Sequence, residues 1–336
     1  MYLDIVYTLK PVGLLEKISG TVIGACIGDA LGKALEDVPE LEATNYYGSK
    51  ISGFVEPHPL SPAFGLSANE TSDESGMMIA LLETLATNGM LDVEDYINRL
   101  SEISSCADPT LLRSISILAK GKDPYKEGVI SYSIFGSICA VGTGIWHYGQ
   151  PTLAAQGARF LASLTHPGEQ SLEAAGIVGV IISTLIGLKG QIKSQEEKID
   201  FLRALRGFSN KKRGGFGGYL DLIEGLIRKE ADTKEAIELV GNSTFAFEAL
   251  GMSIFLFLRF LERPSIALYE AANACGEVGG DTDAIGLLTG AFIGAHWGIE
   301  AFEKELIESL SGWRYYISLA DRIYRQMGFD GGENAI

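Results

Sequence analysis

Residues 279–298 read GGDTDAIGLLTGAFIGAHWG, and this stretch determines the expected fold. Its later glycines recur at every fourth position, and a second stretch, GTVIGACIGDALG at residues 20–32, repeats the pattern. Residues four apart share one face of an α-helix, so each stretch predicts a helix with a smooth ridge. A glycine inside a helix costs about 1 kcal/mol relative to alanine. Eight such positions need a compensating gain, and close helix–helix packing supplies it. The glycines are Gly20, Gly24, Gly28, Gly32, Gly286, Gly290, Gly294 and Gly298.

Apolar residues recur at helical spacing along nearly the whole chain, and hairpin signals between alternating strand patterns are missing. The pattern predicts an all-α protein with about ten to thirteen helices. Prolines and glycines interrupt it, but no interruption is long enough to link two domains. We therefore expect a single compact domain over residues 1–336. It would have an N-terminal extension at 1–14, its main body at 15–320 and a flexible tail at 328–336.

Composition excludes several classes of protein. The hydrophobic fraction is 46% and the net charge is -16, which is typical of a globular protein that repels nucleic acid phosphates and anionic lipids. We therefore expect neither a nucleic acid nor a membrane as partner. The longest apolar run, residues 174–188, falls short of the ~18 residues of a membrane span and predicts a buried helix. No secretory signal is evident, so we expect a cytoplasmic protein with four buried, reduced cysteines. They are Cys26, Cys106, Cys139 and Cys275.

Two segments place hydroxyls and carboxylates where a loop enters a helix: TSDES at residues 71–75 and GGDTDA at residues 279–284. One interpretation is helix capping, with Thr71 and Glu74 at capping-box spacing and Asp281 as an N-cap. However, a cap needs one acceptor, and each segment offers two carboxylates. Clustered carboxylates with hydroxyls are the ligands of a hard cation such as Mg²⁺ or Mn²⁺. Zinc is disfavoured, because the four histidines are isolated and no His/Cys pair has ligand spacing.

At these residues the sequence resembles the ADP-ribosylglycohydrolase family of all-α hydrolases with a dinuclear metal centre. Residues 28–32, GDALG, with Glu36 beyond them, are similar to the family's opening motif GDALG…E. Residues 72–75, SDES, resemble its TDDT, and residues 279–284 resemble its closing GGDTDT. A weaker match is LTHP at residues 164–167, and the resemblance extends over residues 15–320. Glu74 and Ala284 depart from the family's Asp and Thr.

The resemblance implies a hydrolase that uses Mg²⁺ or Mn²⁺, with two ions, to cleave a glycosidic bond of ADP-ribose. The substrate would be an ADP-ribosylated protein or a small ADP-ribose conjugate. The resemblance implies three sets of site residues. The metal ligands would be Ser72, Asp73, Glu74, Asp281 and Asp283. The catalytic residues would be Glu36, Asp73 and Asp281, and the substrate-binding residues would be Gly136, Ser137 and His166. One alternative is a non-catalytic or altered-specificity protein that binds ADP-ribose or a nucleotide at a degraded metal site. Another is a hydrolase of a different nucleoside-like glycoside.

The chain has one basic, glycine-rich tract, KKRGGFGG at residues 211–218. It could contact a diphosphate or RNA, or it could be a solvated loop between helices.

Overall fold

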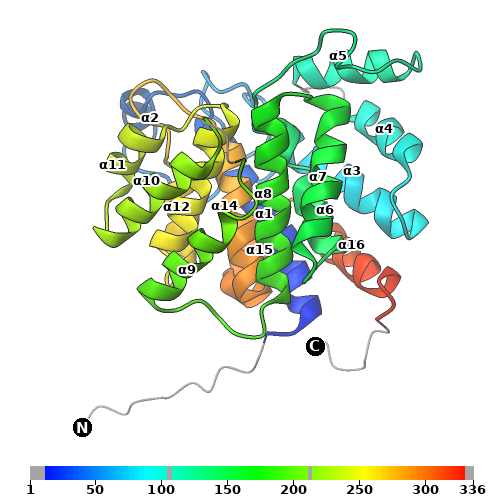
Figure 1. Ribbon diagram of the computed structural model, residues 1–336. Helices are drawn as coiled ribbons and strands as arrows, with labels where there is room; N and C mark the ends of the chain where they lie inside the picture. Colours follow the sequence, from blue (N-terminus) through cyan, green and yellow to red (C-terminus); the bar gives the residue numbers. More distant parts are fainter. Residues whose placement is uncertain (1–11, 104–107, 211–213, 330–336) are drawn as a thin grey trace.

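The computed structural model describes residues 12–103, 108–210 and 214–329 (Figure 1). These residues form sixteen α-helices and three short 3-10 helices, with no strand among them. The all-α prediction is confirmed, whereas the expected ten to thirteen helices are too few. The additional helices are short: α15 has six residues and α6 has seven, which is less than two turns and too little for a periodic pattern to emerge.

In chain order the helices are α1 (Leu14–Gly32), η1 (Lys33–Leu35), α2 (Glu40–Tyr47), α3 (Asp73–Asn88), α4 (Val93–Glu102), α5 (Pro109–Leu118), η2 (Phe135–Ser137), α6 (Ala140–Trp146), α7 (Pro151–Thr165), α8 (Glu169–Gly187), α9 (Gln195–Leu205), α10 (Gly217–Arg228), α11 (Thr233–Val240), α12 (Ala246–Arg259), α13 (Pro264–Ala272), α14 (Thr282–Trp297), η3 (Ile299–Ala301), α15 (Lys304–Ser309) and α16 (Trp313–Gln326).

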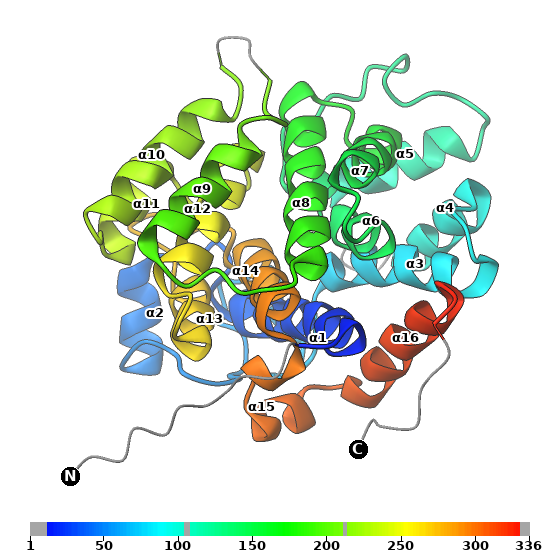
Figure 2. The same ribbon diagram turned by 60° about the horizontal axis from the view of Figure 1, so that its bottom comes forward.

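Helices α1 and α14 pack against each other at the centre of the molecule (Figures 1 and 2). The glycine ridge of each helix faces the ridge of the other in antiparallel order. A Cβ atom built on Gly28 would lie 1.9 Å from the carbonyl oxygen of Gly286, and one on Gly290 would lie 1.9 Å from that of Gly24. No side chain fits between the two backbones, so the predicted close packing is confirmed. The arrangement places the end of α1 beside the start of α14.

The remaining helices surround this pair. Helices α8, α12 and α13 pack on α14, and α16 packs on α1 and α3. In Figure 2, α9–α12 lie on one side of α8, and α3–α7 lie on the other. Two segments have the length and apolar composition of a membrane span, residues 14–35 and 169–187, but 100% and 78% of their apolar windows are buried within the structure. The buried helix expected at residues 174–188 is therefore confirmed as part of α8.

Three of the four cysteines are free and buried, as expected: Cys26, Cys139 and Cys275. Cys106, residues 211–213 of the basic tract and most of the predicted terminal extension and tail lie outside the described residues.

Candidate metal centre and active site

Three chain segments bring acidic residues to the end of the α1–α14 pair. The last turns of α1 carry Asp29, and Glu36 follows η1 directly. Two bonds join the ends of the pair: the Thr282 hydroxyl donates to the Gly32 carbonyl oxygen at 2.7 Å, and the Asp37 amide donates to the Gly280 carbonyl oxygen at 2.9 Å. Because α14 starts here, Asp281 and Asp283 face the end of α1. The third segment is the start of α3, with Ser72 as its N-cap.

Three of these acids converge. Single carboxylate oxygens of Asp29, Glu74 and Asp283 all lie within 4.8 Å of one another, and all three residues are buried. Asp29 accepts hydrogen bonds from the backbone amides of Ser72 at 3.0 Å and Ser75 at 3.2 Å, which fixes α3 against α1. The carboxylate group of Glu74 also bonds the Ser72 hydroxyl.

Asp283 has an oxygen without a partner. Its Oδ1 accepts from the Ala284 amide at 3.0 Å, whereas its Oδ2 is buried and has no hydrogen-bond partner among the described residues. An unpaired buried carboxylate oxygen is costly unless a proton or a cation meets it. Three converging carboxylates with such an oxygen fit a hard divalent cation.

Burial and mutual repulsion raise the pKa values of the whole cluster. Burial, followed by the charges of Glu74 and Asp281, raises the pKa of Glu36 to about 9. Burial also raises the pKa of Asp73 and of Asp281 to about 6. For Glu74 and Asp283, burial and neighbouring acids place the pKa well above the usual range. The described ion pairs include none with any of these carboxylates.

The buried Lys33 lies near the cluster and forms no ion pair with another residue that the structure describes. The Lys33 ammonium donates to the carbonyl oxygens of Ala30 at 3.1 Å and Ala68 at 2.9 Å. Burial lowers its pKa, although the nearby charge of Asp29 opposes this shift. Lys33 therefore offsets only part of the negative charge, and it holds the loop before α3 against the end of α1.

A cavity of about 500 Å³ opens over the acidic cluster, which is within the usual range for a small-molecule site. Glu36, Asp73, Glu74 and Asp281 line it, together with Asp108. Its apolar lining consists of Pro62, Ala63, Leu66, Ile103, Pro109 and Phe135. Acids and apolar side chains thus line the same cavity.

The predicted substrate-binding residues lie behind this wall. Gly136 packs on His166, where an added Cβ would lie 2.4 Å from the histidine Cβ, and the Ser137 hydroxyl donates to the Ser171 carbonyl oxygen at 3.2 Å. The His166 ring is buried, 5.6 Å from the ring of Phe135. None of Gly136, Ser137 and His166 is among the residues that line the cavity.

His166 reaches the cavity indirectly, through a hydrogen bond. Its Nε2 lies 3.1 Å from Oδ1 of Asp108, and its Nδ1 lies 3.0 Å from the Thr165 hydroxyl. Burial alone would raise the pKa of Asp108, but the hydrogen bond and charge of His166 leave it below the usual value. The histidine thus orients an ionised carboxylate that lines the cavity.

Sequence reasoning missed Asp29 as a candidate ligand and left Asp108 without a role. An aspartate within an apolar, glycine-ridged helix is a signal in itself, because a buried acid needs a partner. The capping-box interpretation of Thr71 and Glu74 does not hold: Ser72 is the N-cap of α3, and the Thr71 hydroxyl lies 3.4 Å from the Tyr316 hydroxyl. Asp281 does cap α14, accepting from the Ala284 amide at 3.3 Å.

This fold and site define a class: all-α proteins with carboxylates gathered at the joined ends of two glycine-packed helices. The family model for ADP-ribosylglycohydrolase matches residues 10–332, and the chain belongs to this family. It is 25% identical over 319 residues to a protein of Archaeoglobus fulgidus, covering 92% of this chain and 96% of that protein. It is also 25% identical over 353 residues to ADP-ribosylhydrolase ARH3 of Homo sapiens, covering 93% of each.

A solved structure described as an ADP-ribosylglycohydrolase-related protein complex shares the fold. Its TM-score is 0.69 at 20% sequence identity, over 94% of this chain and 99% of that chain. The family resemblance seen in the sequence is thus confirmed, as is the fold that it implied.

Proposed function

We propose that this protein is a Mg²⁺- or Mn²⁺-dependent hydrolase that cleaves a glycosidic bond of ADP-ribose. The ADP-ribose would be carried by a protein or by a small conjugate. Membership of the ADP-ribosylglycohydrolase family supports the reaction class. The observation that carries the metal requirement is the convergence of Asp29, Glu74 and Asp283 within 4.8 Å, with one oxygen of Asp283 left unpaired.

The residues present fit such a cation. Asp29, Glu74 and Asp283 offer hard oxygen ligands for one ion, and Ser72, Asp73 and Asp281 are the further oxygens proposed for a second. A divalent ion held there would supply Lewis acidity and positive charge for ribose hydroxyls and a water.

The protein's own residues contribute charge, position and exclusion of water. Cleavage at the anomeric carbon passes through an oxocarbenium-like state, which nearby carboxylates stabilise. Asp73 and Asp281 line the cavity and supply that charge, and Glu36 lies beside them, where it can contact the leaving group. Phe135 and the other apolar residues lie beside these carboxylates and displace part of the solvent around them, which strengthens each electrostatic contact.

The test is release of ADP-ribose from defined substrates. Peptides ADP-ribosylated on arginine or on serine, and O-acetyl-ADP-ribose, are incubated with the protein in Mg²⁺, in Mn²⁺ and in EDTA. Chromatography of free ADP-ribose is expected to show turnover of at least one substrate with metal and none with EDTA. Absence of turnover on all three with either metal would reject the proposal.

Ala284 favours a second candidate, a protein that binds ADP-ribose without turnover. Ala284 is fully buried beside Asp283 and has no hydroxyl where the family motif has threonine. Calorimetry with ADP-ribose, read together with the release assay, identifies the second candidate, because such a protein binds ADP-ribose and releases none from any conjugate. Ala284→Ser returns a hydroxyl with little added volume, so a gain of turnover in this variant would identify the missing hydroxyl as the cause.

A further inference from the structure

A second cavity, of about 650 Å³, lies at the opposite end of the α1–α14 pair. We propose that it binds a small organic anion, a molecule with a phosphate or carboxylate group and an apolar or aromatic part. Leu14 and Lys17 contribute from the start of α1, His296 contributes from the end of α14, and the segment after α8 forms the rest of the wall.

The charge of this cavity is opposite to that of the molecule. Acidic residues outnumber basic ones by 43 to 27 in the chain, yet the cavity lining contains Lys17, Lys189 and Lys193 and no acid. Lys189 and Lys193 are exposed, and neither ammonium forms an ion pair with another described residue. Glu197, whose carboxylate accepts from the Lys193 backbone amide at 3.0 Å, offsets part of the Lys193 charge, and Lys189 has no acid in a described ion pair. A local cluster of cations on an acidic protein favours an anion and draws it to this place.

Lys17 places a positive charge beneath the cavity, although burial lowers its pKa to about 8. It is buried, and its ammonium donates to the carbonyl oxygens of Leu185 at 2.8 Å, Ile186 at 3.3 Å and Leu188 at 2.9 Å. These carbonyls end α8, where a cation is favourable. All three ammonium protons of Lys17 are donated to these carbonyl oxygens. Lys17 therefore contributes positive charge to the cavity, and any hydrogen bond to a bound anion must come from other groups.

His296 supplies an unused hydrogen-bonding group. The residue is fully buried, and neither ring nitrogen has a hydrogen-bond partner of ordinary geometry among the described residues. The backbone of Ile192 is close enough to make a weak hydrogen bond with the ring, which partly opposes the lowering of its pKa. Burial, followed by the charge of Lys17, lowers its pKa to about 4, so the neutral ring has one N–H donor to offer. A buried donor without a partner is rare and marks a place where a ligand or water is expected.

The other walls of the cavity are apolar. Val12, Leu14, Ile186 and Leu188 line it, and Tyr148 adds an aromatic face. An inorganic ion would leave this surface uncovered, so the structure favours an anion attached to an apolar or aromatic group. Helix α1 has 19 residues, which at 1.5 Å per residue separates this cavity from the acidic end by about 28 Å.

Isothermal titration calorimetry tests the proposal in EDTA, where no divalent cation can draw an anion to the acidic cluster. The probes are phenyl phosphate and benzoate, which share a ring and differ in their anion, with benzyl alcohol as an uncharged probe and inorganic phosphate as a probe without the ring. The test variant is Lys189→Glu with Lys193→Glu. The matched control, Lys120→Glu with Lys234→Glu, makes the same change in net charge at exposed positions away from the cavity.

We expect phenyl phosphate or benzoate to bind with a stoichiometry of one and more tightly than inorganic phosphate or benzyl alcohol. The test variant should weaken this binding about tenfold, while the control variant changes it by less than about twofold. Whichever anion binds more tightly identifies the natural head group as phosphate or carboxylate. Absence of binding by both up to about 10 mM, or equal weakening in the two variants, would overturn the proposal. Neither result depends on hydrolysis of ADP-ribose.

Discussion

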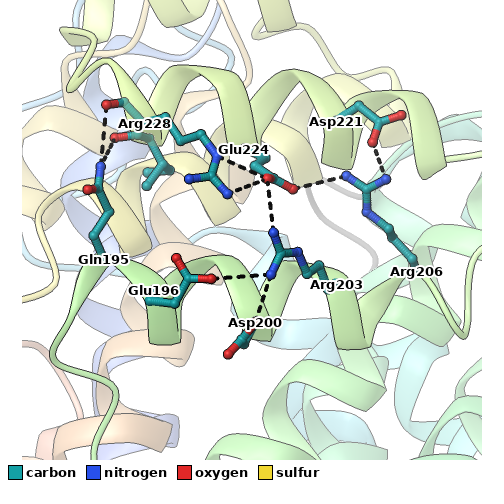
Figure 3. A network of polar contacts seen from close by, with 9 residues as sticks. Gln195, Glu196, Asp200, Arg203, Arg206, Asp221, Glu224 and Arg228 are labelled. Carbon is teal, nitrogen blue, oxygen red and sulfur yellow. Dashed lines mark hydrogen bonds and ion pairs between the residues drawn. The ribbon is translucent and has the colours of Figure 1, made fainter.

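Two clusters of carboxylates in this molecule have opposite electrostatic surroundings. Between α9 and α10, Glu224 lies among three arginines, with Arg228 at 2.8 Å, Arg206 at 3.3 Å and Arg203 at 3.8 Å (Figure 3). The hydrogen bond from Arg228 leads the effects that lower the pKa of Glu224. At the end of the α1–α14 pair, no described ion pair reaches Glu74, and its pKa is raised well above the usual value.

The difference shows which cluster depends on something outside the chain. Ion pairs near the surface, such as those that half-buried Glu224 forms with partly exposed arginines, contribute little to stability, and the chain supplies both partners. Buried acids without cations oppose folding, because burial and like charge both disfavour their ionised forms. Keeping Asp29, Glu74 and Asp283 together therefore requires protons or a cation at this place, and the metal centre proposed above is one way to meet that requirement. The arginine-paired cluster has no such requirement.

The largest expected effect is on turnover. Asp283→Asn removes a carboxylate charge from the buried cluster and is predicted to lower kcat by about 10²–10³-fold, the loss typical of a lost electrostatic contact in an active site. Asp221→Asn makes the same chemical change in the arginine-paired cluster around Glu224, here called the surface network, at a residue paired with Arg206. This variant should leave kcat within about twofold. Steady-state assays compare the two variants, using whichever of the three conjugates tested under the proposed function is turned over fastest. Equal losses would remove the functional distinction between the clusters.

The next effect is on stabilisation by metal. Millimolar Mg²⁺ or Mn²⁺ should stabilise the unsubstituted protein by RT ln(1 + [L]/Kd), which is ~2.7 kcal/mol at a hundredfold excess over Kd. In Asp281→Asn and Asp283→Asn this gain should shrink, while stability in EDTA stays level or rises because repulsion is relieved. Thermal melts with EDTA and with each cation provide the measurement. If neither cation changes the melting temperature of the unsubstituted protein, the proposed metal centre is contradicted.

A smaller effect is predicted for pH. The buried acids have folded-state pKa values above their unfolded ones, so their contribution to stability is full below about pH 4 and is lost as pH rises through the folded values. Those values are about 6 for Asp73 and Asp281 and about 9 for Glu36. Stability in EDTA, measured by urea unfolding, should therefore fall between pH 5 and pH 9. Stability that rises over this range would show that these acids are not the controlling groups.

The smallest effect is expected at the surface network. Glu224→Gln removes the carboxylate that three arginines share, yet the melting temperature should fall by less than about 2 °C, because exposed pairs are screened. Melts at low and high salt check this, and the difference from the unsubstituted protein should shrink as salt is added. A large, salt-independent loss would mean that this cluster is as important to the fold as the buried one.

Much of the architecture could be predicted from the sequence because it rests on local periodicity. The glycine ridges predicted close packing, and the two loop-to-helix segments predicted acids that meet although about two hundred residues separate them. Which helix packs against each ridge could not be predicted, because a glycine pattern indicates close packing without indicating the helix that makes the contact. Asp29 escaped notice as a candidate ligand for the same reason: only the pairing of α1 with α14 brings it to Asp283.

The predicted substrate-binding residues show a second limit. Gly136, Ser137 and His166, which the resemblance implied as substrate-binding residues, do come together, but Phe135 and Asp108 line the cavity and these three residues do not. Similarity of sequence indicates which region of the fold lies near the site. The direction of the side chains within a single 3-10 turn then decides which residue of that turn faces the ligand. The roles of these residues, and of Glu36, remain predictions.

The contact of backbone with backbone between α1 and α14 has a mechanical consequence. Two helices separated by side chains can spread apart as rotamers change, but here the carbonyl oxygens of one helix already occupy the space of the other's missing Cβ atoms. The pair is therefore stiff, and the acids at its end cannot drift apart to relieve their repulsion. Only a proton or a cation can do so. Because the pair is stiff, the carboxylates would need little rearrangement to bind a cation, whereas a flexible site would have to become ordered first.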